Sequence, residues 1–175
     1  PFVLMFRKPA QPTATTTEPD APMSVNIDTL VRHMALPKGK HAKLAFFGLD
    51  QSRVLLPAMQ KRLGAQATIY DVVLEEWATS TNEIPPPPPG VRVEVLRTVG
   101  GKLPRSADDL TFSAVVFADA YHRIWEPVRL LEQLRGKLAK GGRVVVLDRN
   151  GPVAEPRRLA GHRRRISAGQ VREDF

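Results

Sequence analysis

Short segments of buried-strand type alternate along this chain with segments that carry apolar side chains at helical spacing. Most of the short runs are nearly continuous in apolar residues, which is typical of a strand buried on both faces, while residues 91–95 alternate apolar and charged residues. Strands that alternate with helices over short connections favour βαβ units with right-handed crossovers. We therefore predict an α/β fold with a doubly wound, mainly parallel sheet. The predicted strands are residues 44–47, 67–70, 91–95, 112–117 and 143–147.

Three segments have one apolar face when they are drawn as helices, one before the first strand and two between strands. Two of them end at glycine, at Gly64 and at Gly141-Gly142, which is the residue that favours a helix C-terminus. Pro127 opens the third segment, as proline does at the first helical turn. Pro57 lies near the start of the second, where we expect it to bend the helix or to mark a late start. The predicted helices are residues 25–36, 53–63 and 127–140.

The 175 residues leave room for one compact domain and an extension, since a domain takes about 150 residues. Residues 7–24 consist mostly of Pro, Thr, Ala and Glu and offer almost nothing to bury, so they read as an extended linker. We therefore divide the chain into an N-terminal extension, residues 1–24, and an α/β domain, residues 25–175. Residues 85–89 are a run of prolines that predicts a stiff surface spacer inside the domain.

Cysteine is absent, which excludes a disulfide scaffold, a thiolate zinc site and a cysteine nucleophile. No apolar run reaches the length of about 18 residues that a membrane-spanning helix needs. Residues 2–6 are too few for the core of a signal peptide, and the basic pair Arg7-Lys8 follows them instead of preceding them. The chain begins at Pro1, which fits a processed or trimmed form. We expect a cytoplasmic protein or, alternatively, an organellar one that has lost a targeting segment.

The net charge of +8 is concentrated toward the end of the chain. Residues 149–175 hold seven basic and three acidic side chains, which is half of the excess. Such a cluster can meet nucleic-acid phosphate, an acidic partner or a lipid surface, and it can equally be a solvated, charge-rich end. The candidate contact residues are Arg157, Arg158, Arg163, Arg164 and Arg165.

Residues 112–148 carry a resemblance to a known family. A strand leads into a loop that ends in His122, and a helix then runs into Lys140-Gly141-Gly142 and the next strand. This order resembles the second half of class I S-adenosylmethionine-dependent methyltransferases. Residues 161–174 resemble the helix that follows strand five in the same family. The similarity covers residues 27–175 and implies a Rossmann-like sheet and a methyl-transfer activity, whose acceptor it does not identify.

The resemblance also implies a site for S-adenosylmethionine, with a degenerate motif. Of the three glycines that follow strand one in the family, the chain keeps Gly48, and Asp50 and Ser52 replace the others. Asp71, 23 residues after Gly48 (71 − 48), stands where the family places the carboxylate that binds the ribose hydroxyls. The acidic residue near the adenine would fall at Thr98-Val99 and is absent, and Ser113 replaces the Asp that opens strand four. The implied cofactor residues are Gly48, Asp50, Asp71 and Asp119.

Each of these residues has a second interpretation that needs no ligand. Asp71 can cap a turn, and Asp50 with Ser52 can cap the following helix. His122 is a candidate general base beside the weaker catalytic candidate Tyr121, but a histidine in this position can also bond a neighbouring loop. His162 is predicted to belong to the charged surface. No His, Asp and Glu grouping has metal-ligand spacing in the sequence, so we expect no metal.

Two functions from different classes follow. The first is a methyltransferase with weak affinity for its cofactor, and the second is a non-catalytic structural or assembly subunit with the same fold. A third, nucleic-acid binding by the arginine-rich end, is less favoured because no aromatic residues are interleaved with the arginines.

The predicted fifth strand has no neighbour on its outer side. The family usually continues into an antiparallel hairpin beside this strand, whereas this chain stops 27 residues after Asp148 (175 − 148). An apolar strand at a sheet edge invites another strand. The candidates are the chain's own residues 2–6, the same segment of a second copy, or a different protein. We expect self-association or a protein partner at this edge.

Overall fold

The structure is a computed structural model, and it describes residues 2–7, 26–36, 41–49, 55–63, 67–75, 92–153 and 155–175. Its strands are β1 (Phe2–Arg7), β2 (Ala42–Phe47), β3 (Ala67–Val73), β4 (Arg92–Arg97), β5 (Phe112–Ala118) and β6 (Leu138–Arg149). Its helices are α1 (Ile27–Met34), α3 (Leu56–Leu63), α4 (Pro127–Lys137), α5 (Ala160–Arg163) and α6 (Ala168–Asp174). The 3-10 turns are η4 (Arg105–Ala107), η5 (Tyr121–Arg123) and η6 (Arg157–Leu159).

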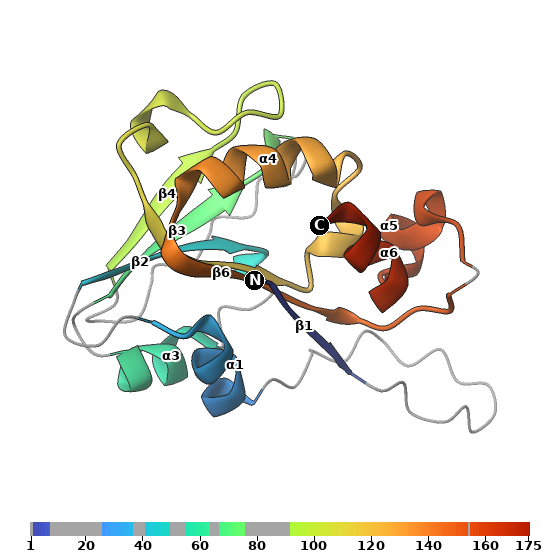
Figure 1. Ribbon diagram of the computed structural model, residues 1–175, viewed down its shortest axis with the longest axis horizontal. Helices are drawn as coiled ribbons and strands as arrows, with labels where there is room; N and C mark the ends of the chain where they lie inside the picture. Colours follow the sequence, from blue (N-terminus) through green and yellow to red (C-terminus); the bar gives the residue numbers. More distant parts are fainter. Residues whose placement is uncertain are drawn as a thin grey trace.

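The six strands form one sheet in the order β1-β6-β5-β2-β3-β4, and each pair of neighbours is parallel. The chain runs outward from β2 to β4 and then returns to β5 on the other side of β2. The direction of winding therefore switches between β2 and β5, as the doubly wound prediction requires. Helices lie on both faces of this sheet (Figure 1).

The side chains of successive residues in a central strand lie on opposite faces of the sheet, and both faces are buried. In β2, Phe46 belongs to the core under α1 and α3, while Phe47 belongs to the core under α4, α5 and α6. Phe47 stacks on Phe117 of β5 with ring centroids 4.5 Å apart. Because both faces are covered, the inner strands have to be apolar throughout, which is the pattern that made them recognisable in the sequence.

The helix predictions are confirmed in their positions. Helix α3 begins at Leu56, so Pro57 marks a late start and does not bend the helix. Proline is tolerated there because the first backbone N–H groups of a helix have no partner within it. At the end of α4 the prediction was wrong by three residues, since the helix stops at Lys137 and β6 begins at Leu138.

The Gly141-Gly142 pair lies inside β6, where we expected a turn between helix and strand. Phe112 pairs with Leu138 and Ala114 pairs with Arg143, so β6 holds extra residues at an irregularity in the ladder. Gly141 has φ +79°, and a Cβ on Gly142 would lie 2.9 Å from the carbonyl oxygen of Ala139. The glycines therefore allow a bulge, which lets the chain leave α4 directly into the sheet.

The C-terminal segment forms two short helices, although a single helix was expected. Arg164 adopts φ 50°, a left-handed conformation that ends α5. Ser167 then starts α6 with a capping box, in which its side chain accepts from Gln170 N and the Gln170 side chain accepts from Ser167 N.

The outer edge of β6 is covered by the chain's own N-terminal strand. β1 runs parallel to β6 from Phe2 opposite Val144 to Arg7 opposite Arg149. Residues 2–7, within the predicted N-terminal extension, thus form a strand of the sheet, because the outer backbone of β6 offers them hydrogen-bond partners. The first of the three candidates for this edge, the chain's own segment, is the one that the structure contains.

Several predictions fall outside the described residues. They concern Asp50, Ser52, Gly64, most of the linker, and the proline run at residues 85–89. In the part of the chain that the structure describes, no helix is long and apolar enough to cross a membrane.

Candidate functional site

The polar side chains of interest gather where β5 and β6 end. Asp119 follows β5 directly, η5 comes next with His122 and Arg123, and Asp148 is the next-to-last residue of β6. Because β5 and β6 are parallel neighbours, their carboxyl ends meet at one edge of the sheet. Ligands bind at this edge in doubly wound folds.

Asp148 holds His122 in place. The His122 Nδ1 atom lies 2.9 Å from Asp148 Oδ1, and both side chains are buried. Asp148 also accepts hydrogen bonds from the backbone N–H groups of His122, at 3.0 Å, and of Arg149, at 2.8 Å. An ionised carboxylate only accepts, so Nδ1 donates to it, and in the neutral ring the other nitrogen of His122 is an acceptor. This is the tautomer that a general base needs.

Asp119 sits between two arginines. Its Oδ1 atom is 3.6 Å from Arg149 Nε and 4.0 Å from His122 Nδ1, and its Oδ2 atom is 3.6 Å from an Arg164 nitrogen. Its backbone is left-handed, with φ 50°, and its N–H donates to Leu147 O at 2.9 Å. The Oδ1 atom is buried without a hydrogen-bond partner. Asp119 is thus a buried charge that guanidinium groups balance at longer range.

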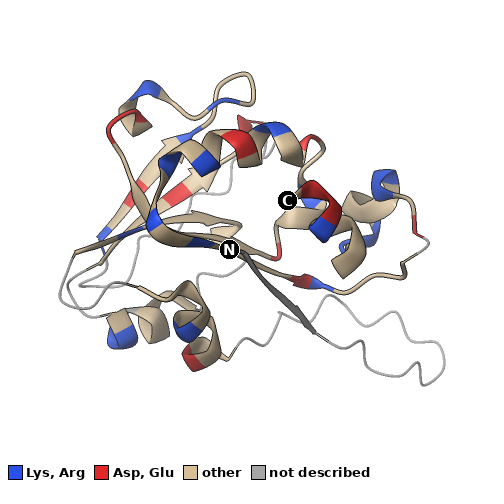
Figure 2. Ribbon diagram, in the orientation of Figure 1, with Lys and Arg blue, Asp and Glu red and all other residues tan. Residues whose placement is uncertain are grey.

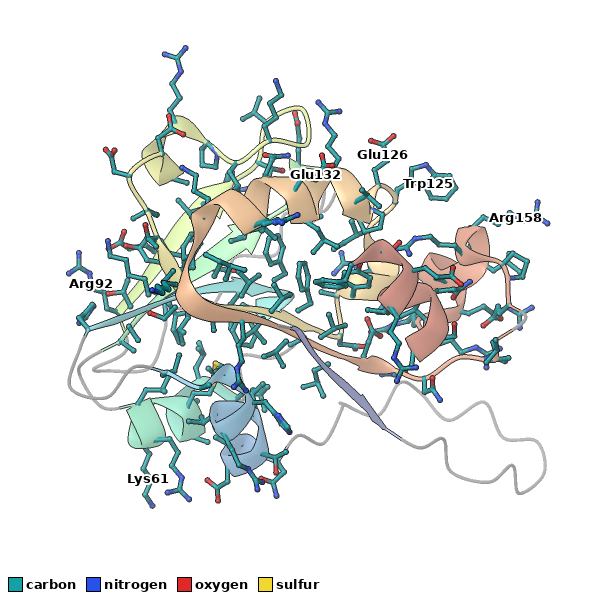
Figure 3. The ribbon with its side chains drawn as sticks, in the orientation of Figure 1. Lys61, Arg92, Trp125, Glu126, Glu132 and Arg158 are labelled. Atoms are coloured by element: carbon teal, nitrogen blue, oxygen red, sulfur yellow. The ribbon has the colours of Figure 1, made fainter. Side chains whose placement is uncertain are left out.

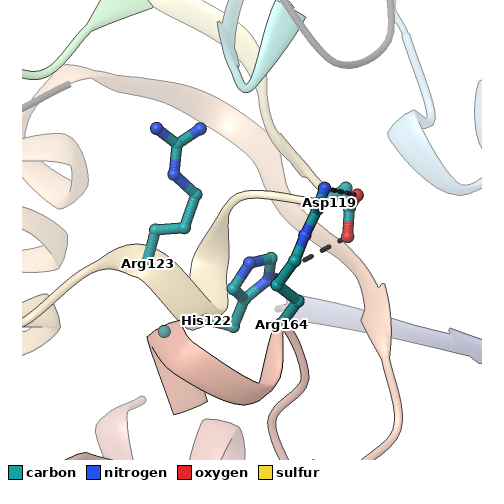
Figure 4. Close-up of a pocket in the computed structure, with 5 residues that line it drawn as sticks. Asp119, His122, Arg123 and Arg164 are labelled. Carbon is teal, nitrogen blue, oxygen red and sulfur yellow. Dashed lines mark ion pairs between the residues drawn. The ribbon is translucent and has the colours of Figure 1, made fainter. Parts of the chain in front are cut away.

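A cavity of about 240 Å³ opens beside these residues. It is lined by Asp119, His122, Arg123, Gly161 and Arg164, so η5 forms one wall and the end of α5 the other (Figure 4). A second cavity of about 160 Å³ adjoins it and shares His122, Arg123 and Gly161 with it. It continues past Trp125 and Arg158, which project outward in Figure 3.

Asp119, His122 and Asp148 also form a potential metal-binding group that the sequence did not reveal. Each offers one ligand atom, and these atoms lie within 4.8 Å of one another. They are brought together by the β5–β6 pairing, and the only signal in the sequence was that both aspartates follow predicted strands. In this geometry Asp148 already accepts from three N–H groups and Nδ1 points its hydrogen at Asp148. A cation would have to displace that bond, so the arrangement fits an oriented histidine better.

Tyr121, the second catalytic candidate, has a structural role. Its hydroxyl is buried and donates to Asp174 Oδ2 at 2.8 Å, and the same oxygen binds Arg157 at 2.5 Å. Its ring packs edge-on against Phe117 and stacks on Phe175. Burial and then the Asp174 carboxylate raise the pKa of Tyr121 above 10.0. The residue is therefore a neutral hydrogen-bond donor that fastens α6 to η5.

Most arginines of the predicted basic cluster form ion pairs with acidic side chains. Arg165 binds both oxygens of Glu155, at 2.8 and 2.9 Å, and this contact lowers the pKa of Glu155. Arg163 also approaches Glu155, while Arg157 and Arg164 bind aspartates as described. Figure 2 shows the acidic residues beside the basic ones in this region. Arg158 is the member that makes no ion pair with a described residue.

Gly48 and Asp71 lie at the carboxyl side of β2 and β3. A Cβ on Gly48, whose φ is +81°, would lie 2.3 Å from Ala118 O and 2.7 Å from Ala120 Cβ. The glycine is therefore required by the packing of β2 against the end of β5, whatever else binds there. Asp71 is buried within the last three residues of β3, where we expected it just after the strand.

A carboxylate that we did not single out lies near the end of β4. Thr98, at the position where the family carries an acidic residue, is buried and accepts from Glu75 N at 3.0 Å. The Glu75 carboxylate in turn accepts from Gly100 N at 2.7 Å. Glu75 follows β3 by two residues, and only its place after a strand could have suggested it.

Comparison with solved structures assigns the fold. A SAM-dependent methyltransferase from Aquifex aeolicus superposes with a TM-score of 0.54 and 17% identity over 85% of this chain and 76% of that chain. The fold is that of a class I methyltransferase. The S-adenosylhomocysteine-bound form of CalO1, a methyltransferase in calicheamicin biosynthesis, gives a TM-score of 0.52 and 16% identity. This match covers 85% of this chain and about half, 47%, of CalO1. No protein-family model and no curated protein sequence matches the chain.

Proposed function

We propose that this methyltransferase-like protein transfers a methyl group from S-adenosylmethionine and takes the proton of its acceptor with His122. The observation that carries the proposal is the 2.9 Å bond from His122 Nδ1 to Asp148, in a residue that lines a cavity of about 240 Å³. The fold of the superposed methyltransferases supports the same chemistry.

The cofactor would lie at the carboxyl ends of β2 and β3. Asp71 is a carboxylate, the group whose oxygens can accept from ribose hydroxyls, and it comes from the strand next to Gly48. The position of Asp71 at this edge supports the placement, whereas the burial of Asp71 and the packing of Ala118 and Ala120 beside Gly48 leave little space for the cofactor there. Asp119 would lie on the side that faces the acceptor. When bound, S-adenosylmethionine supplies an electrophilic methyl group.

The chain's own residues would handle the proton. The second ring nitrogen of His122 would accept it from a hydroxyl or amine of the acceptor, as that oxygen or nitrogen bonds to the methyl carbon and the methyl–sulfur bond breaks to leave S-adenosylhomocysteine. Asp148 then stabilises the resulting imidazolium through the Nδ1 hydrogen bond, as a buried carboxylate does in other His–Asp pairs. The cavity walls would hold the acceptor so that an encounter in solution is replaced by a bound geometry.

A second candidate is a non-catalytic subunit of the same fold. The replacement of two family glycines by Asp50 and Ser52 favours it, because a glycine at these positions lets the backbone approach the cofactor in the family. The two candidates differ in one observable property, since only the enzyme needs the second nitrogen of His122.

The test is methyl transfer from tritium-labelled S-adenosylmethionine to a panel of small phenols, amines and hydroxy acids. His122→Asn is the variant of choice, because the asparagine amide can donate to Asp148 as Nδ1 does but has no second nitrogen. We expect transfer to fall by about 100-fold or more. Cofactor binding and the unfolding midpoint should stay unchanged.

Arg135→Gln is the matched control, since Arg135 is exposed on α4 and lines neither cavity. Transfer that survives His122→Asn would overturn the role of the histidine. Absence of transfer to any acceptor, together with recovery of the chain in a stable complex, would favour the subunit.

A further inference from the structure

The cavity beside His122 has an excess of positive charge. Of the described residues that line it, Asp119 is the one carboxylate, and Arg123 and Arg164 provide two guanidinium groups. Arg149 flanks Asp119 from the other side at 3.6 Å, so the Asp119 charge is shared between two arginines. A ligand that enters this cavity therefore meets more cation than anion.

The second cavity also has a positively charged lining. Arg157, Arg158 and His162 line it, with Arg123 and His122 on the shared wall, and among the described residues no carboxylate lines it. Trp125, whose side chain is 71% exposed, adds a flat apolar surface at its rim. Cavities of about 240 and 160 Å³ have together the size of a small-molecule site.

We propose that the acceptor is a small organic acid, with its carboxylate or phosphate bound by Arg123 and Arg164 and a planar body that reaches toward Trp125. This inference rests on the proposed function only in calling the bound acid a methyl acceptor. The anion site itself is argued from the lining residues alone. Guanidinium groups suit both anions because their paired N–H donors match two oxygens at once.

Gly161 offers a way to block the site without disturbing the fold. It lies in α5 on the wall common to both cavities, and a Cβ there would have its nearest neighbour, His122 O, at 3.8 Å. Alanine is thus accommodated sterically and favours helix over glycine. Gly161→Ala should narrow the passage and leave the chain at least as resistant to urea.

The experiment measures binding to the full chain by calorimetry, without cofactor and in about 50 mM salt, so that charge contacts are weakly screened. The probes are 4-hydroxybenzoate and phenyl phosphate, with 4-hydroxybenzamide and phenol as their neutral counterparts. We expect at least one acid to bind about tenfold or more tightly than its neutral counterpart. The stronger of the two acids identifies which anion the site prefers.

The variants Arg123→Gln and Arg164→Gln should each lower the affinity for that acid by about tenfold, while Arg135→Gln should leave the affinity unchanged. Gly161→Ala should also lower this affinity. Because this variant should remain folded, weaker binding would then reflect loss of the site and not loss of the fold. Equal affinity for acid and neutral probe, absence of binding by all four, or equal losses in the Arg135 control would overturn the proposal. Tighter binding of a single-stranded oligonucleotide that depends on Arg158 would overturn it in favour of nucleic acid.

Because these titrations contain no S-adenosylmethionine, they fail independently of the proposed function. An acid that binds but is never methylated contradicts the methyltransferase and leaves the anion site standing. Methylation of an uncharged acceptor contradicts the anion site and leaves the methyltransferase standing.

Discussion

The Oδ1 atom of Asp148 lies 2.9 Å from the Nδ1 atom of His122, and this contact joins two segments that are 26 residues apart. It connects the last turn of the chain before α4 with the end of β6. The same carboxylate holds two backbone N–H groups, so one buried side chain fixes both the ring and the loop that carries it.

Asp148→Ala should be among the most damaging single changes. It leaves the N–H groups of His122 and Arg149 and the ring of His122 without their acceptor in a buried site. Loss of a buried partner of this kind costs about 3 kcal/mol or more. Urea unfolding followed by circular dichroism measures it. Asp108→Ala, at an exposed carboxylate in the same chain, should change the free energy of unfolding by less than about 0.5 kcal/mol. Equal effects of the two changes would contradict the role of Asp148.

Tyr121 should ionise only when the protein unfolds. The chain has two tyrosines, so Tyr70→Phe leaves Tyr121 as the single titrating phenol. Its pKa is raised in the folded state by burial and by Asp174. A raised pKa in the folded state stabilises the protein below the unfolded value of about 10, and this contribution is lost as the pH rises further. We expect the absorbance at 295 nm in Tyr70→Phe to rise together with loss of the circular dichroism signal. Ionisation near pH 10 in a folded chain would contradict the buried hydrogen bond to Asp174.

Gly48 and Gly136 provide a matched pair of glycine-to-alanine changes. At Gly48 the new Cβ would lie 2.3 Å from Ala118 O with φ +81°, so we expect a loss of about 2 kcal/mol or more. At Gly136, in α4, a Cβ meets nothing within 4 Å, and alanine should be neutral or stabilising by up to about 1 kcal/mol. Urea midpoints that shift in the same direction for both variants would contradict the close packing of Gly48 against the end of β5.

Deletion of residues 1–7 should promote self-association. It uncovers the edge of β6 opposite Val144 to Arg149, which β1 pairs in the intact chain. An apolar strand with unpaired backbone groups then invites a second copy. Light scattering coupled to size exclusion measures the mass of both forms. We propose that any partner of the intact chain at this edge must exchange with β1. We therefore expect the intact chain and the deletion variant to differ in oligomeric state. The same oligomeric state for both would show that β1 does not prevent association at this edge.

Most of the fold could be predicted because its inner strands are buried on both faces. Residues such as Phe46-Phe47 and Val144 to Leu147 are apolar in succession, which is typical of strands in a parallel sheet that is covered on both faces. The bulge at Gly141-Gly142 was not predictable in the same way, because glycine signals a turn and a bulge alike. The left-handed Arg164 that divides α5 from α6 carries no local signal, since arginine is not a residue that favours this conformation.

The site was predicted residue by residue but not as an arrangement. Asp119 and His122 stood out because they follow a strand, whereas Asp148 was noted only as the end of a strand. Their contact depends on the register of β5 against β6, which pairs Ala118 with Leu147. The arginine-rich end was interpreted by its charge, and the partners of Arg157 and Arg165 come from α6 and from the loop before η6. Such pairings follow from tertiary structure and leave little trace in a local sequence.

The most direct test of the account is calorimetric titration of the full chain with S-adenosylmethionine. We expect one saturable site with a dissociation constant of about 100 μM or weaker, roughly −5.5 kcal/mol, because Asp50 and Ser52 replace two family glycines. Asp71→Ala should weaken it by more than about tenfold, and Asp108→Ala should leave it unchanged. Absence of any binding at about 10 mM cofactor, or binding that ignores Asp71→Ala, would contradict the claim that this sheet edge serves methyl transfer.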